Sequence, residues 1–179
     1  FMPLTSMYIG EIQRSVGEKV DTDIWTEMDT LTQNVGTDNV DLTDDNFIDA
    51  DRQINDGKAS GDERVMVISS LTLSALQRME RTNNSLYKGN YNLDLSKAGP
   101  GYKGMMLGYG VYMTQNLPAG AAGKVGFAFH RWALAHVRQK DIGVRVAQAH
   151  DELAQSVIAY TIYGNKLMRA TIGVELRGK

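Results

Sequence analysis

The chain has 179 residues, 42% of them hydrophobic, and its 19 basic and 21 acidic side chains give a formal net charge of −2. This composition supports a hydrophobic core in one domain or two small interleaved ones, and the weakly acidic balance argues against a protein that grips nucleic acid with clustered Lys and Arg. The lack of cysteine excludes disulfides and thiolate metal sites, and without an apolar run of about 18 residues or a signal-like N-terminus we expect neither a membrane span nor a secretory leader.

A long amphipathic helix is predicted from Tyr8 to Leu31. Its apolar residues recur every three or four positions, at Ile9, Ile12, Val16, Val20, Ile24, Met28 and Leu31. This spacing forms one helical stripe, and some 24 residues at about 1.5 Å each give a rod of roughly 36 Å. Gly10 and Gly17 weaken the helix, and Trp25, beside the stripe, is expected to pack against other side chains rather than to bind a ligand.

A loop and a short helix are predicted next. Gln33 to Asp41 is polar and reads as the loop, and Thr43 is a good N-cap for a helix that contains Phe47 and Ile54. The same region holds an acidic cluster, made up of Asp38, Asp41, Asp44, Asp45, Asp49 and Asp51. The cluster lacks the Asp-x-Asp-x-Asp-Gly frame and distal Glu of a calcium loop, so helix capping is the preferred interpretation.

The middle of the chain alternates short elements with loops. Arg64 to Ser69 predicts a strand and Leu71 to Glu80 a helix, whereas Asn83 to Lys103 has the weakest pattern and predicts a long loop. Val111 to Thr114 is a further strand, which Pro118 ends.

After a small-residue loop at Ala119 to Lys124, Val125 to Phe129 predicts a strand, and Arg131 to Gln139 predicts an Ala-rich helix. Ile142 to Val146 alternates as a half-buried strand, and Val157 to Tyr163 is again β-rich. The pair Gly164-Asn165 then predicts a tight turn, and Lys166 to Leu176 predicts the final strand.

Two glycine-rich segments resemble nucleotide-binding loops without their chemistry. Gly99 to Gly104 matches G-x-G-x-x-G, but Pro100 offers no amide to a pyrophosphate, and the required strand and helix are missing. Gly120 to Lys124 is too short for a P-loop, and Val125 stands where Ser or Thr would hold Mg²⁺.

The histidines His130, His136 and His150 lack a metal-binding i, i+4 spacing, and no nucleophile elbow is present. The sequence therefore predicts no catalytic, cofactor-binding or metal residue, no cofactor and no enzymatic activity.

Two short motifs stand out in the second half of the chain. A strand that ends in Thr114-x-Asn116-Leu117-Pro118 precedes a second short strand, and Tyr163-Gly164 with Leu167-Met168-Arg169 comes before the last strand. This order resembles the major capsid protein family of tailed bacteriophages, whose Hong Kong phage-type fold is shared with encapsulins. In that family the first motif is a Thr-x-Asn/Ala-x-Pro turn; Ala170 stands where many members carry proline after the arginine.

The resemblance implies an α+β phage capsid fold with two interleaved domains. Residues 1–36 are expected to form the spine helix of a peripheral domain, residues 37–139 an axial domain with a central sheet flanked by helices, residues 140–162 the peripheral strand pair, and residues 163–179 a return strand in the axial domain. The chain is expected to match the C-terminal part of a member, without its N-terminal arm, extended hairpin and first peripheral strand. Lys88 to Lys103 is expected to contact other copies near the capsomer axis.

The function implied by the resemblance is that of a major capsid protein, in pentamers and hexamers of an icosahedral shell around double-stranded DNA. The expected location is the virion, assembled in the host cytoplasm; scaffolding, portal and decoration proteins are further expected partners, with packaged DNA held without sequence-specific contact and no membrane. Two alternatives stay open: an encapsulin-like compartment shell, and a small α/β ligand-binding domain or enzyme.

Overall fold

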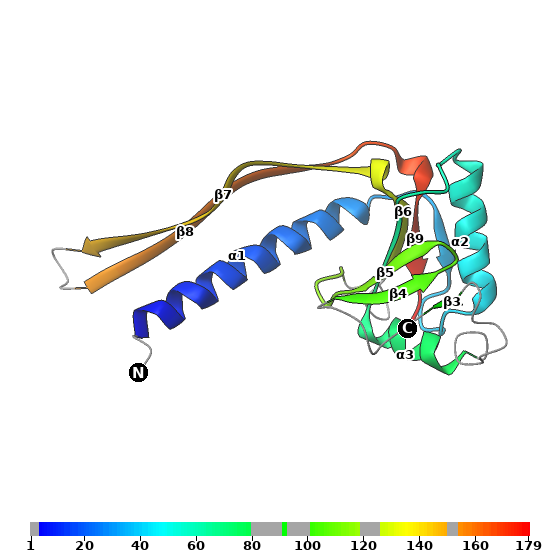
Figure 1. Cartoon of the computed structure of the whole chain (residues 1–179), viewed down its shortest axis with the longest axis horizontal. Coiled ribbons are helices and arrows are strands. Elements are labelled where there is room, and N and C mark those ends of the chain that lie inside the picture. Colours follow the sequence, from blue (N-terminus) through cyan, green and yellow to red (C-terminus); the bar gives the residue numbers. More distant parts are fainter. Residues whose placement is uncertain (1–3, 80–90, 93–100, 119–125, 150–153) are drawn as a thin grey trace.

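The computed structural model describes residues 4–79, 91–92, 101–118, 126–149 and 154–179, which form two parts of different shape (Figure 1). A long helix, α1 (Leu4–Met28), lies along a two-stranded antiparallel ribbon of β7 (Leu134–Ala149) and β8 (Ala154–Leu167). We call these three elements the arm. The remaining elements surround one mixed sheet, which we call the body, and the C-terminus lies there.

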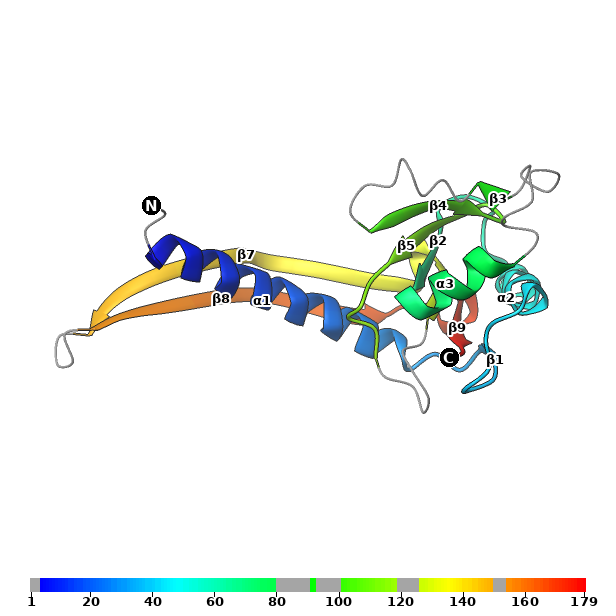
Figure 2. The ribbon, with the colours of Figure 1, turned by 90° about the horizontal axis from the view of Figure 1, so that it is seen from below.

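The helix α1 confirms the prediction from apolar spacing, although it runs from Leu4 to Met28 rather than from Tyr8 to Leu31. Its 25 residues, at about 1.5 Å each, span roughly 37 Å. Burial is strongest toward its C-terminal end, at Val20 and Met28, and Leu31 is buried just beyond it. Figure 2 shows α1 running along the ribbon toward the body. The helix therefore enters the core of the body only with its last turns.

Two helices of the body begin at local caps, and the cap at Thr43 is the one that the sequence predicts. In α2 (Asp44–Asp56), Thr43 is the N-cap, and the side-chain oxygen of Asn46 accepts the backbone N–H of Thr43 at 2.9 Å. In α3 (Ser70–Arg78), the hydroxyl of Ser69 accepts the Thr72 backbone N–H at 3.2 Å. Such caps satisfy amides that have no partner inside the helix.

Among the described residues, seven strands form the sheet of the body, in the order β1-β9-β6-β2-β5-β4-β3. Their bounds are β1 Asn34–Gly36, β2 Arg64–Ile68, β3 Tyr91–Asn92, β4 Tyr102–Met106, β5 Tyr109–Met113, β6 Gly126–His130 and β9 Gly173–Arg177. The pairs β1–β9 and β2–β5 are parallel, and the other neighbours are antiparallel. A two-residue turn joins β4 to β5, with φ of 51° at Leu107 and 82° at Gly108, as a tight hairpin turn requires.

The sheet buries apolar side chains on both faces. On one face, Phe47 of α2 and Leu76 of α3 pack in a cluster with Met66 of β2. The next residue of β2, Val67, belongs to a second cluster, which contains Met28 at the end of α1. Because successive side chains of a strand point to opposite faces, these neighbours serve separate cores. One core holds the body together, and the other joins the body to the arm.

The predicted helix from Arg131 to Gln139 is wrong. Only a short 3-10 turn, η2 (Arg131–Ala133), follows β6, and β7 begins at Leu134. The local Ala-rich spacing is overridden because β7 pairs with β8 along nearly its whole length, which supplies cross-strand hydrogen bonds and side-chain contacts that a short helix here would lack.

The predicted turn at Gly164-Asn165 is also wrong, for the same reason. Both residues lie inside β8, opposite Val137 and His136 of β7. The predicted last strand from Lys166 to Leu176 is divided, because β8 ends at Leu167 and the turn η3 (Ala170–Ile172) precedes β9.

The remaining predictions at the level of elements have mixed outcomes. The strands predicted at Arg64–Ser69, Val111–Thr114 and Val125–Phe129 are confirmed as β2, β5 and β6. Of the predicted loops, Gln33–Asp41 contains the short strand β1, and Asn83–Lys103 contains β3 and the start of β4. The rest of that second loop lies outside the described residues.

Candidate assembly surface and its supporting junction

The carboxylate of Asp21 ties α1 to the body. Its Oδ2 accepts a hydrogen bond from the Thr114 hydroxyl at 3.2 Å and another from the Asn116 side-chain amide at 2.9 Å. The Thr114 hydroxyl oxygen also accepts the Asn116 backbone N–H at 3.3 Å, just after β5. The Thr-x-Asn motif found in the sequence therefore has a physical role, because its two side chains donate hydrogen bonds to α1.

Two more carboxylates of α1 hold the ribbon. The Tyr163 hydroxyl of β8 donates to Asp23 at 2.6 Å, and the Leu167 backbone N–H donates to Glu27 at 3.1 Å. Hydrogen bonds from Lys19 and then from Tyr163 lower the pKa of Asp23, and the same bond to Asp23 raises the pKa of Tyr163. The face of β8 that carries Tyr163 and Leu167 is thus turned toward α1.

Aromatic packing completes this junction. The ring of Trp25 stacks on Phe127 of β6, with centroids 6.0 Å apart and planes 11° from parallel, and it meets Phe129 at 6.3 Å. These contacts confirm that Trp25 packs against other side chains. The end of α1 is therefore fixed to the sheet by stacked rings as well as by Asp21.

The opposite face of the ribbon is exposed and apolar. Along β8, Ile158, Tyr160 and Ile162 are 50%, 39% and 50% exposed, and they alternate with the half-buried residues that face α1. On β7, Val137 is 65% exposed and lies opposite Gly164 of β8. We call the surface made by Val137, Ile158, Tyr160 and Ile162 the outer face of the arm. No described element of the chain covers it (Figures 1 and 2).

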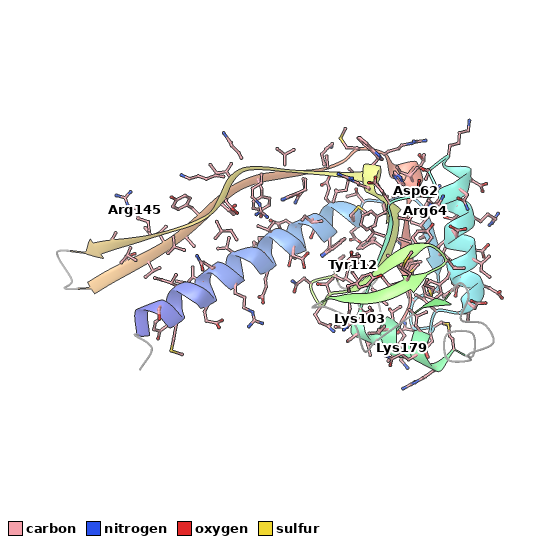
Figure 3. The ribbon with its side chains drawn as sticks, viewed as in Figure 1. Asp62, Arg64, Lys103, Tyr112, Arg145 and Lys179 are labelled. Carbon is pink, nitrogen blue, oxygen red and sulfur yellow. The ribbon has the colours of Figure 1, made fainter. Side chains whose placement is uncertain are left out.

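Basic side chains border the outer face. The ammonium of Lys140 lies 4.4 Å from the centroid of the Tyr160 ring. Arg145 of β7 lies directly opposite Ile158 of β8 in the ribbon. Figure 3 shows Arg145 pointing away from α1. Lys166 is exposed on the same side of β8, two positions after Gly164. The outer face thus combines an apolar centre with a basic rim.

An exposed tryptophan marks the corner between the body and the arm. Trp132 of η2 is 71% exposed, and Met168, just after β8, is 66% exposed. Trp132 lines two hollows, of about 450 and 420 Å³; Lys58 and Arg169 also line the first, and Met168 also lines the second. Such exposure of large apolar side chains is typical of surfaces that bind another protein.

Buried charge in the body has a structural arrangement. The guanidinium of Arg64 donates to Asp51 at 2.7 Å and to the Tyr109 hydroxyl at 3.2 Å, and that hydroxyl donates to Asp51 at 2.8 Å. Burial, and then the hydrogen bond to Asp51, raise the pKa of Tyr109. The network joins α2 to β2 and β5, and its members satisfy one another.

The residues weighed for chemistry in the sequence are scattered. His130 is buried, and its Nδ1 accepts the Trp132 backbone N–H at 3.2 Å, whereas His136 is exposed beside Asn165; His150 lies outside the described residues. Within the described ranges, no group of three His, Cys, Asp or Glu side chains is placed to hold a metal ion. No described helix is both long and apolar enough to cross a membrane.

The glycine-rich segments are only partly described. Gly101 precedes β4 and Tyr102 to Gly104 lie within it, while Gly99, Pro100 and the segment from Gly120 to Val125 lie outside the described residues. In the acidic cluster, Asp44 and Asp45 occupy the first turn of α2, as expected for helix capping.

Comparison with known proteins identifies the fold. No protein-family model and no curated protein sequence matches the chain. Among solved structures, one of Mycobacterium phage Che8 matches with a TM-score of 0.75 and 20% identity, over 94% of this chain and 61% of that one. The capsid structure of the cyanophage P-SCSP1u matches with a TM-score of 0.72 and 13% identity, over 100% and 67%. The chain has the phage major capsid fold.

A virus-like particle from Pyrococcus furiosus shares this fold at a lower TM-score of 0.55, with 12% identity over 89% of this chain and 63% of that one. The chain spans roughly two thirds of the length of these phage capsid structures or less, namely 61 to 67%. The arm and the body described above are therefore the elements that this chain shares with capsid structures.

The sequence identifies the hydrogen-bond donors of the junction between α1 and the body but not their acceptor. Thr114 and Asn116 stand in a recognisable motif, but their acceptor Asp21 is more than 90 residues away and looks like any other charge on the solvated face of a helix. Trp132 was assigned to a helix that does not exist. The useful signal for the outer face was the alternation of Ile158, Tyr160 and Ile162, which shows one apolar side but not which side α1 covers.

Proposed function

We propose that this chain is a capsid shell subunit of a tailed double-stranded DNA phage. The carrying observation is the outer face of the arm, a row of apolar side chains that the described part of the chain leaves uncovered in a molecule with a phage capsid fold. The total accessible surface supports the same conclusion. It is 10999 Å², whereas a compact monomer of 19.8 kDa exposes about 8,600 Å².

The excess surface is comparable to what subunits bury when they associate. It amounts to roughly 2,400 Å² on one chain, and a stable protein interface buries about 800 Å² on each partner, so the excess is enough for several such contacts. Contacts that repeat between identical copies generate closed assemblies. The shape of the chain is therefore suited to a lattice of many copies.

The two parts of the molecule suggest the domain roles. The proposal assigns α1 and the β7–β8 ribbon to a peripheral domain, and the sheet with α2 and α3 to an axial domain. Relative to the ranges expected from the sequence, 1–36 and 140–162 as peripheral and 37–139 and 163–179 as axial, the proposal moves 134–139 and 163–167 to the peripheral domain, because β7 begins at Leu134 and β8 ends at Leu167, and moves β1 (Asn34–Gly36) to the axial domain. Lys88 to Lys103, mostly outside the described residues, remains the proposed contact near the capsomer axis.

The proposed assembly consists of pentamers and hexamers in an icosahedral shell that encloses double-stranded DNA without sequence-specific contact. Assembly in the host cytoplasm, with scaffolding, portal and decoration proteins as further partners, belongs to the same proposal. The role is structural, with no catalytic step assigned to any residue.

A second candidate function is a compartment shell that holds protein cargo. The structural match to a virus-like particle supports this candidate. The higher TM-scores of the phage capsid structures favour the phage shell. The contents of purified particles separate the two, because a phage shell made during infection encloses DNA and a compartment encloses protein.

The experiment is sedimentation of the purified protein over a wide range of concentrations, followed by electron microscopy of the fastest fraction. The expected result is a shift from monomers to rings and shells as the concentration rises. Sedimentation as a monomer at every concentration would overturn the proposed function, and turnover or tight binding of a small molecule by that monomer would then favour a ligand-binding domain or enzyme.

A further inference from the structure

The outer face of the arm has the anatomy of a protein-binding surface. Val137, Ile158 and Ile162 are each at least half exposed, and Tyr160 lies between the two isoleucines. A centre of apolar side chains inside a polar rim is the usual arrangement of protein interfaces. The rim here has one dominant sign, since β7 and β8 together carry four basic side chains and one acidic side chain, a net of +3.

The chemistry of this face restricts its occupant. Aliphatic side chains at its centre favour a protein surface with apolar side chains of its own, and the basic rim favours one whose border is acidic. The occupant is therefore expected to be a mostly acidic surface around at least one exposed aliphatic residue.

The chain itself carries such a surface on the far side of the body. The helix α2 contains five acidic side chains and one basic side chain, a net of −4. On the exposed side of α2, Asp45 and Asp49 are near neighbours of Ile48, which is 43% exposed, and Asp56 lies about two turns further along. Arg52 pairs with Asp49 at 3.3 Å and leaves this side acidic overall. We call these residues the acidic side of α2.

The dimensions of the two surfaces agree. The 13 residues of α2 span about 20 Å at 1.5 Å per residue. Along β8, the eight steps from Ile158 to Lys166 span about 26 Å at 3.3 Å per residue. A helix the length of α2 therefore fits along the outer face.

Within one molecule the two surfaces lie at separate ends, with α2 on the side of the body opposite to the arm (Figure 1). We propose that the outer face of the arm docks a second copy of this chain through the acidic side of its α2. The inference rests on the proposed shell function and names one of its contacts. Because the two surfaces differ, the contact is heterologous, and repetition of a heterologous contact produces rings or extended lattices rather than isolated dimers.

Charge reversal on each surface tests the contact. Arg145→Glu with Lys166→Glu reverses the rim of the outer face and leaves the Lys140–Tyr160 contact in place. Asp49→Lys with Asp56→Lys reverses the acidic side of α2; Asp56 is the last residue of the helix, where a cation is favourable, and Asp49 lies near its middle. A matched control, Arg78→Glu with Lys179→Glu, changes the net charge as much as the first variant but lies on exposed residues of the body.

The measurement is the protein concentration at which half of the sample sediments as oligomers, after nuclease treatment, at about 0.1 M and about 1 M NaCl. Each reversal is expected to raise this concentration about tenfold or more at the lower salt, because like charges then face each other. The combined variant, with both surfaces reversed, is expected to return to within about threefold of the wild type. The control is expected to assemble like the wild type, and circular dichroism melts show that each variant is folded.

Three results overturn the inference and leave the proposed function standing. The reversed variants assemble like the wild type, the combined variant assembles no better than either reversal, or nuclease treatment abolishes wild-type assembly and so identifies nucleic acid as the occupant. A wild-type protein that stays monomeric at every concentration overturns the proposed function and this contact together.

Discussion

Asp21 is the residue at which α1 meets the turn that follows β5 at Thr114. Its carboxylate accepts two side-chain hydrogen bonds from the body, and it is half-buried, so its replacement leaves donors that water reaches only in part. Asp21→Ala is expected to lower the free energy of unfolding by about 1–3 kcal/mol.

Urea denaturation of wild type and variant measures this loss. The control is Glu11→Ala, which removes an exposed carboxylate from the same helix without a described hydrogen bond to the body and is expected to change stability by less than about 0.5 kcal/mol. Equal effects of the two substitutions would show that Asp21 acts only as a surface charge.

Gly57 connects the end of α2 to η3 by close contact of two backbones. A Cβ at this position would lie 1.9 Å from the carbonyl oxygen of Thr171, and the Gly57 carbonyl accepts a hydrogen bond from Arg169 at 2.7 Å. Gly57→Ala is therefore expected to cost about 1–3 kcal/mol in thermal or urea unfolding, because the backbones must separate.

Gly61→Ala is the matched control for Gly57, since no atom lies within 4 Å of the added Cβ there. A variant at Gly57 as stable as the one at Gly61 would contradict the contact between α2 and η3.

At the scale of elements, the sequence predicted those whose signals are local. The stripe of α1, the cap at Thr43 and the β-branched run of β2 each identify their element without knowledge of the rest of the chain. The start of β7 could not be predicted this way, because its small residues fit a helix and its pairing partner lies in β8. The candidate surface needed the same long-range information, since only the position of α1 decides which side of the ribbon is covered.

The helix α1 contains glycines that its environment does not require. A Cβ at Gly17 would meet no atom within 4 Å apart from the helix itself and its neighbours. Gly17→Ala is expected to stabilise the protein by about 0.5–1 kcal/mol, because alanine loses less backbone entropy in a helix.

Thermal melting of the variant checks this gain. Gly143→Ala in β7 is the contrast, because its Cβ would lie 2.8 Å from the Tyr160 ring and displace that side chain from the outer face. A loss of stability with Gly17→Ala would show that this part of α1 is not a regular helix.

The link between α1 and β8 predicts a pH dependence. The lowered pKa of Asp23 in the folded state means that its contribution to stability is present above the unfolded pKa and is lost as the pH falls through the folded value. Tyr163→Phe removes one of the hydrogen bonds that lower this pKa, so the pKa of Asp23 is expected to rise toward its usual value. The loss of stability on acidification is then expected to become smaller.

Carboxyl NMR titration of Asp23, together with urea unfolding at neutral and acidic pH, measures both effects. Tyr8→Phe is the control, because Tyr8 is 59% exposed on α1 and has no described contact with Asp23. An unchanged Asp23 pKa in Tyr163→Phe would remove the proposed link between rod and ribbon.

At the scale of the whole molecule, stability and assembly depend on different surfaces. The body has cores on both faces of its sheet, and the base of the arm shares the second core through Met28 and Leu31. Farther out, α1 and the ribbon cover only one face of each other, so the outer face contributes little to folding and remains available for association.

Serine substitutions on the outer face separate the two properties. Ile158→Ser with Ile162→Ser removes apolar side chains that are each 50% exposed, so the melting temperature is expected to fall only slightly, within about 1 kcal/mol of stability. Assembly is expected to require a much higher protein concentration, because each copy of the contact loses two apolar side chains from its centre.

The comparison is Met7→Ser with Tyr8→Ser, a pair of similar exposure near the start of α1. Sedimentation of both double variants at matched concentrations gives the answer. Loss of assembly with the outer-face pair alone assigns the contact to the ribbon, because both pairs remove a similar exposed apolar area. An outer-face variant that assembles like the wild type would mean that the ribbon is exposed in the assembled particle, and that the subunits associate through the body.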